Sequence, residues 1–198
     1  MVEVFFLDYT SGLVIIDDNV IMRLPVAIYS WVLAALFLGF LALNATATTY
    51  YVNAGNPAPA PPYTSWLTAA TNIQDAVALT ANGDTVLVTN GVYAHGGMPV
   101  IAGFTYRIAV TNAVTVESVN GPWVTTIWGG GITNESPDVG CAWLTNGASL
   151  IGFTVEGGNT IFNGGGIWCA SSKNYVQDCV IVSNTAEEFG DGVYQGDA

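Results

Sequence analysis

Short apolar runs alternate with Gly- and Asn-containing turns over the second half of the chain. Residues 153–168 align with residues 179–194 at a shift of 26, so that Val155 meets Ile181. The same shift brings together Leu150 and Val176, Gly164 and Gly190, Gly166 and Gly192, Ile167 and Val193, and Trp168 and Tyr194. One period holds two short strands and no helical segment. A period of this length, made of strands and turns, is typical of a parallel β-helix, in which each repeat forms one turn of a solenoid.

Earlier strands fit the period more loosely. Val88 and Val116 lie 28 residues apart, and Val116 and Val155 lie 39 apart, which is 13 more than one period. We assign the excess to residues 129–140, a turn-rich stretch interpreted as a looped-out insertion. The pattern as a whole predicts an all-β solenoid whose strands stack in parallel about 4.8 Å apart.

Alternation along each strand predicts which side chains enter the core, because successive residues of a strand point to opposite faces. The inward positions are Val114, Val116, Phe153, Val155, Ile167, Cys179, Ile181 and Val193. The outward positions are Thr115, Glu117, Thr154, Glu156, Trp168 and Tyr194. The clusters at residues 129–131 and 164–166 are Gly triplets that precede strands, so we interpret them as corners of the solenoid.

The segment before these strands has a different character. Four prolines within residues 53–63 prevent helix and ladder pairing, so residues 48–64 are predicted to be an extended Pro-rich lead-in. Apolar positions at helical spacing then predict one short helix over residues 68–79, with Ser65 or Thr68 as its N-cap. This helix would cover the open end of a β-helix that occupies residues 65–198.

Residues 1–47 have the pattern of a leader. Arg23 precedes the uncharged run 24–43, and small residues at 45 and 47 follow it, as in a secretory signal peptide. Cleavage is expected after Ala47, whereas an uncleaved membrane anchor is the alternative. The residues before Met22 are acidic, which is atypical of a signal start, so we expect translation to begin at Met22. The predicted location is therefore extracellular or at the cell surface, outer membrane included.

Composition narrows the classes of partner. The 198 residues include 15 acidic and 3 basic ones, a formal net charge of −12, and only 9% of the residues are charged. Three cations cannot form the basic face that a nucleic-acid-binding protein needs. An acidic surface also repels polyanions. Contact with a membrane is expected only through the leader or through a region that follows residue 198.

Two stretches resemble a known superfamily. Residues 73–93 resemble the entry of pectate-lyase-like right-handed parallel β-helix proteins, where a capping helix leads through G-D-T-V into the first strand. Their sequence is I-Q-D-A-V-A-L-T-A-N-G-D-T-V-L-V-T-N-G-V-Y. Residues 150–158, L-I-G-F-T-V-E-G-G, and 164–169, G-G-G-I-W-C, resemble repeats of the same superfamily and of chlamydial-type polymorphic outer-membrane proteins. The resemblance implies a right-handed single-stranded β-helix and admits polysaccharide lyases or glycoside hydrolases. Because the chain ends directly after a repeat, we expect an N-terminal fragment of a longer protein.

Few residues suit catalysis. Arg107 and Lys173 are the available basic side chains after residue 47, and neither lies in a motif that we can match. Glu187, Glu188 and Asp191 could gather on one side and bind calcium through oxygen ligands, which makes calcium the one cofactor that the pattern admits. The alternative is a solvated acidic face, with Asp191 as an ordinary turn residue.

The remaining candidate functional residues are two aromatic residues, the histidine and two cysteines, and ordinary packing or exposure in a loop is the alternative interpretation. Trp168 and Tyr194 would stack on adjacent turns of one outward face, where aromatic rings can lie against the apolar faces of sugars; otherwise they pack on neighbouring loops. His95 is the single histidine and is predicted to be a surface loop residue. Cys169 and Cys179 are predicted to be packed and reduced, with a disulfide between them as the alternative.

The sequence therefore predicts an exported β-helix module, without catalysis, that serves adhesion or binds polysaccharides or cell-surface glycans. The alternative is the N-terminal part of a polysaccharide-degrading lyase or glycoside hydrolase. The pattern leaves the question of enzymatic activity open.

Overall fold

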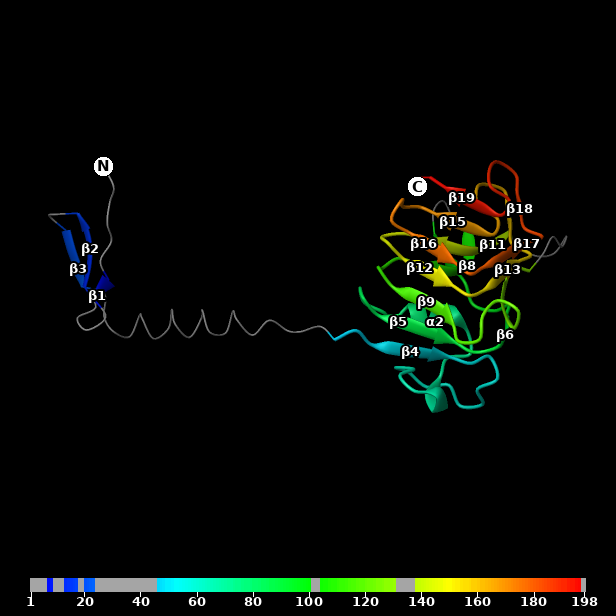
Figure 1. Cartoon of the computed structure of the whole chain (residues 1–198), viewed down its shortest axis with the longest axis horizontal. Coiled ribbons are helices and arrows are strands. Elements are labelled where there is room, and N and C mark those ends of the chain that lie inside the picture. Colours follow the sequence, from blue (N-terminus) through cyan, green and yellow to red (C-terminus); the bar gives the residue numbers. More distant parts are fainter. Residues whose placement is uncertain are drawn as a thin grey trace. The chain divides into compact units, whose positions relative to one another are not determined.

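A computed structural model describes residues 7–8, 13–17, 20–23, 46–100, 104–130 and 138–196 (Figure 1). The chain divides into two compact units, Met1–Thr46 and Ala47–Ala198. In the first unit β1 (Leu7–Asp8), β2 (Leu13–Asp17) and β3 (Val20–Arg23) form an antiparallel sheet in that order. The apolar run 24–43, and with it the predicted signal peptide, lies outside the described residues. No helix in the described ranges is long and apolar enough to cross a membrane.

The second unit is a parallel β-solenoid in which the strands of successive turns stack into three sheets. The first sheet has the order β16-β12-β9-β5-β4, with β4 (Thr49–Val52), β5 (Thr85–Val88), β9 (Thr115–Ser118), β12 (Ser149–Ile151) and β16 (Tyr175–Gln177). The second has the order β17-β13-β10-β6, with β6 (Gly91–Tyr93), β10 (Thr125–Trp128), β13 (Thr154–Glu156) and β17 (Val180–Val182).

The third sheet has the order β19-β15-β11-β8-β7, with β7 (Met98–Pro99), β8 (Thr105–Val110), β11 (Val139–Leu144), β15 (Ile167–Cys169) and β19 (Val193–Gln195). All pairs in the three sheets are parallel except β7 with β8. At one corner β14 (Asn159–Thr160) pairs in parallel with β18 (Thr185–Ala186). The predicted all-β parallel β-helix is thereby confirmed.

The 26-residue register is confirmed in the later turns. Val155 pairs with Ile181, and the same offset joins Leu150 to Val176, Ile167 to Val193 and Trp168 to Tyr194. The register predicted for the earlier turns is wrong. Val116 pairs with Val86 and Leu150, at offsets of 30 and 34, and Val155 pairs with Ile127.

The physical reason for these offsets is that the earlier turns contain longer connections between their strands. One connection joins β10 to β11 and includes most of the predicted insertion, although residues 131–137 lie outside the described part of the chain.

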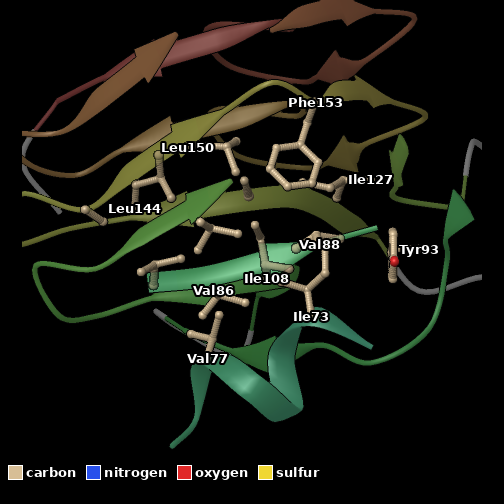
Figure 2. Packing of buried hydrophobic residues seen from close by; sticks show 14 of the residues in the cluster. Ile73, Val77, Val86, Val88, Tyr93, Ile108, Ile127, Leu144, Leu150 and Phe153 are labelled. Atoms are coloured by element: carbon tan, nitrogen blue, oxygen red, sulfur yellow. The ribbon is translucent and has the colours of Figure 1, made fainter. Parts of the chain in front are cut away.

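The core runs along the interior of the solenoid between the three sheets (Figure 2). Five of the predicted inward residues are fully buried, namely Val114, Val116, Phe153, Val155 and Ile167. Cys179 and Ile181 are partly buried and pack against the core. Val193 lies on the inward side, as its pairing with the buried Ile167 shows, but it is 45% exposed. The reason is that β19 lies at the edge of the third sheet, so Val193 has a neighbouring strand on one side only.

The predicted helix exists but is shorter than expected. A 3-10 turn, η1 (Trp66–Thr68), precedes the helix α2 (Ile73–Val77). The expected N-cap is wrong: Ser65 makes no capping hydrogen bond, whereas the side chain of Asn72 accepts a hydrogen bond from the Asp75 amide at 2.9 Å. Ile73 and Val77 point from α2 into the end of the core, so the helix covers that end as predicted (Figure 2). The lead-in also contributes a strand that was not predicted, β4.

Glycines allow the corner beside β14 to be tight. A Cβ atom on Gly158 would lie 1.9 Å from the Gly165 carbonyl oxygen, and one on Gly165 would lie 2.1 Å from that of Thr185. Gly164 has a φ of +64°, a conformation that other residues rarely adopt. Successive turns of backbone therefore approach each other at this corner without intervening side chains, as the triplet 164–166 predicted.

Candidate functional site

Trp168 lies where the register predicted, but it is not open to solvent. It belongs to a row of outward residues on the third sheet, with Trp143 and Tyr194 on the neighbouring strands. Its side chain is nevertheless only 2% exposed. The prediction that Trp168 offers a free ring is therefore wrong.

The reason is a cover of aromatic residues over the outer side of β15. The Trp168 ring centroid lies 5.7 Å from that of Phe162, 6.4 Å from that of Tyr106 and 5.6 Å from that of Tyr194. Phe104 stacks on Phe162 at 5.4 Å and extends this cover. The Trp168 indole also donates a hydrogen bond to the Gly196 carbonyl at 3.2 Å. Tyr194 remains half-buried at the edge of the cluster, so its role in ligand binding stays an untested prediction.

The predicted acidic residues are exposed but not gathered into a metal site. Glu187, Glu188 and Asp191 all lie on the connections around β18. Asp191 accepts a hydrogen bond from the Ala186 amide at 2.8 Å, which is the behaviour of a turn residue. Within the described ranges, no group of three or more His, Cys, Asp and Glu side chains is arranged to hold a metal. Calcium binding stays a prediction to which this geometry adds no support.

A different pair of tryptophans is exposed on the second sheet. Trp128 is the last residue of β10 and is 39% exposed, because its neighbour Ile127 points into the core. Trp123 lies in the turn before β10 and is 84% exposed. Sequence reasoning missed both residues. The alternation in T-T-I-W could have identified Trp128 as outward, whereas no periodic signal predicts the exposure of a turn residue such as Trp123.

Polar side chains lie beside Trp128 on the outward side of the sheet. Glu156 pairs with Trp128, and Thr154 pairs with Thr126, so the outward residues of β10 and β13 lie side by side. The Thr154 hydroxyl donates a hydrogen bond to the Pro122 carbonyl at 2.7 Å and thereby holds the turn that carries Trp123 against β13. We call this set the Trp123–Trp128 face; it consists of Val92, Trp123, Val124, Thr126, Trp128, Thr154, Glu156, Val180 and Val182.

Arg107 fixes the end of β10 where Trp128 lies. Its guanidinium donates to the carbonyls of Trp128 at 3.0 Å and of Gly129 at 2.9 Å, and also to that of Gly96. Burial lowers the pKa of Arg107, but an arginine remains charged at any ordinary pH. With its donors directed to backbone carbonyls, Arg107 positions the strand rather than a reacting group.

The other candidates for acid–base or nucleophilic chemistry are poorly placed. Lys173 and His95 are exposed, His95 as predicted. The cysteines Cys141, Cys169 and Cys179 are free, so the predicted disulfide alternative is wrong. Burial raises the pKa of the Cys141 thiol to about 12, which keeps it protonated and unreactive near neutral pH.

A small pocket lies beside α2, at the junction with the third sheet. Gln74, Val77, Met98, Ala109 and Asn112 contribute to its lining, and its volume is about 210 Å³. Gln74 uses its side-chain oxygen to accept the Ala109 amide at 2.7 Å, so the main polar group of the pocket is already satisfied. The pocket therefore has less to offer a ligand than the Trp123–Trp128 face. Comparison of the chain with protein-family models, with curated proteins and with solved structures finds no match.

Proposed function

We propose that this chain is an exported β-helix module that binds neutral glycans on its Trp123–Trp128 face and serves adhesion at or outside the cell surface. The observation that carries the proposal is the presence of two exposed tryptophan side chains, one at the end of β10 and one in the turn directly before that strand. An indole ring can lie against the apolar face of a sugar, and both rings are available without any rearrangement of the core.

The groups around the rings fit a sugar ligand. Thr126 and Glu156 lie on the outward side of β10 and β13, and Glu156 pairs with Trp128, so both can bond to the hydroxyls of a sugar held there. A small ligand is oriented by a few polar groups that lie at defined positions beside apolar surface. Residues 48–198 contain eleven acidic and two basic side chains, a formal charge of −9. This charge disfavours acidic polysaccharides and favours neutral ones.

A second candidate is the N-terminal part of a polysaccharide-degrading enzyme of the pectate-lyase-like superfamily. The parallel β-helix and the resemblance of residues 73–93 favour it. It would need a carboxylate pair or an available cationic base. Glu156 is the carboxylate best placed to act on a glycan held by Trp128, because the two residues pair across β10 and β13.

Tryptophan fluorescence during titration with a panel of neutral oligosaccharides tests the binding function. Trp123→Ala and Trp128→Ala should each weaken binding about tenfold or more, which corresponds to about 1.4 kcal/mol. Phe189→Ala is the matched control, since Phe189 is an aromatic residue that is 67% exposed and lies outside the face. Binding that is unchanged in both tryptophan variants would overturn the proposed face. Release of reducing or unsaturated ends that is lost in Glu156→Gln would favour the enzyme instead.

A further inference from the structure

Asp84 is a buried carboxylate in the turn between α2 and β5. Its side chain is 5% exposed. One oxygen accepts a hydrogen bond from the Thr48 backbone amide at 2.7 Å, and the other accepts one from the Ala81 amide at 2.7 Å. Both of these partners are neutral backbone groups. A charged group so far from water is costly unless it has hydrogen bonds and an opposite charge.

Among the described residues of the second unit, no positive side chain faces this carboxylate. From β4, Tyr50 lies nearby: burial, and then the charge of Asp84, raise the pKa of its phenol, which donates to the Leu79 carbonyl. From α2, the acid Asp75 is exposed and bonds to Asn72. The cationic side chains of this unit are Arg107, which bonds to three distant carbonyls, and the exposed Lys173. Within the described part of the second unit, the charge on Asp84 therefore has no counter-ion.

Thr48 lies where the chain joins the solenoid. Its carbonyl accepts a hydrogen bond from the Thr85 amide at 3.0 Å, and β4 begins at the next residue. Thr46 and Ala47 are exposed, and the division between the two units falls between them. The predicted cleavage after Ala47 thus lies one residue past this division and directly before Thr48, whose amide and carbonyl are both bonded to the second unit.

We propose that Asp84 is a binding site for the α-ammonium group that cleavage after Ala47 creates on Thr48. A leader peptidase adds water across the Ala47–Thr48 peptide bond: the C–N bond breaks, Ala47 leaves as a carboxylate, and the nitrogen of Thr48 gains protons to become an ammonium. The atom that donates a neutral hydrogen bond to Asp84 before cleavage then carries a positive charge at the same place. Processing supplies the counter-ion of a buried acid and stabilises the mature fold. This inference depends on leader removal but not on glycan binding.

The proposal gives the stability of the mature protein a defined pH dependence. An α-amino group ordinarily has a pKa of about 7.7–8.0, and the partner Asp84 raises the pKa of the Thr48 group in the folded state. A raised pKa means that the added stability is fully present below pH of about 8 and is lost as the pH rises through the folded-state value.

The test uses exported, processed protein whose N-terminus is determined by mass spectrometry. Periodate cleaves an N-terminal threonine between Cα and Cβ and replaces its amine by an aldehyde, without touching lysine. At pH 6.5 this treatment should lower the melting temperature of the wild type by about 4 °C or more, whereas treated and untreated Asp84→Asn protein should melt alike. Asp178→Asn, an exposed acid, is the matched control and should respond to periodate as the wild type does.

Each outcome bears on the proposal. An N-terminus other than Thr48 would overturn it, as would an equal effect of periodate on wild type and Asp84→Asn. If Asp84→Asn does not fold, the pKa of the α-amino group measured by NMR in the wild type replaces it. A value at or below 7.7–8.0 would overturn the proposal, and a higher value would support it.

Discussion

Replacement of Trp168 by alanine should destabilise the fold strongly, although Trp168 lies on the outward side of its strand. The ring is enclosed by Phe162, Tyr106 and Tyr194 and is only 2% exposed. The same substitution at Trp123, which is 84% exposed, is the matched control. The two variants remove the same atoms from two surroundings, one enclosed and one open to water.

The expected loss in the free energy of unfolding follows from the burial of the Trp168 ring. A buried aromatic side chain removes about 150–250 Å² from water, which at about 25 cal/mol per Å² amounts to roughly 4–6 kcal/mol as an upper bound. Measured Trp→Ala changes in protein cores cost about 3–5 kcal/mol. A domain has about 5–15 kcal/mol of stability in total, so Trp168→Ala should consume a large part of it. Trp123→Ala should stay within about 0.5 kcal/mol of the wild type.

Urea unfolding followed by circular dichroism measures the difference. With a slope of about 2 kcal/mol per M, the midpoint of Trp168→Ala should fall by about 2 M, whereas that of Trp123→Ala should hardly move. Equal midpoints for the two variants would refute the argument, because they would mean that the aromatic cover over β15 contributes nothing to stability. An unfolded Trp168→Ala protein beside a folded Trp123→Ala protein would agree with it.

Four further predictions concern the core, the glycine corner and the thiols. Val155→Asp should prevent folding, since an unpaired charge would replace a fully buried side chain; a folded protein by circular dichroism and gel filtration would contradict the stacking. Gly158→Ala should lower the melting temperature by several degrees, because the new Cβ would lie 1.9 Å from the Gly165 carbonyl oxygen; an unchanged value would show that the corner can widen. Native protein should react with iodoacetamide at Cys179 before Cys141, as mass spectrometry can show, and equal rates would contradict the burial of Cys141. Because the pKa of Cys141 is raised to about 12, its contribution to stability should be full below pH of about 8.5 and fall toward pH 12, as urea titrations at several pH values would measure.

The later turns could be predicted from sequence because their connections have equal lengths. The 26-residue shift placed Val155 beside Ile181 and Ile167 beside Val193, and the structure has both pairs. In the earlier turns the connections differ in length, so that Val116 lies beside Val86 rather than Val88. A fixed period cannot recover such a register, because only the fit of side chains across the core decides which residues pair.

The candidate site was harder to predict than the fold. Alternation correctly put Trp168 on the outward side, but outward does not mean exposed: Phe162 reaches over it from a connection whose path no local pattern fixes. For the same reason the sequence did not predict the exposure of Trp123, which lies in a turn that is bonded to Thr154 through the Pro122 carbonyl. The Asp84 contact joins residues 36 positions apart and becomes visible only once β4 is known to pair with β5.

The stacking of each strand on its predecessor has a consequence for how the protein is made. In the three large sheets of the solenoid the strands follow one another in chain order, from β4, β6 and β7 toward β16, β17 and β19. A chain emerging N-terminus first can therefore complete α2 and its first turn before the next turn is synthesised. Each finished turn then offers a template edge to the segment that follows. Such a chain can fold in the order of its synthesis, with little need to keep long unfolded stretches waiting for distant partners.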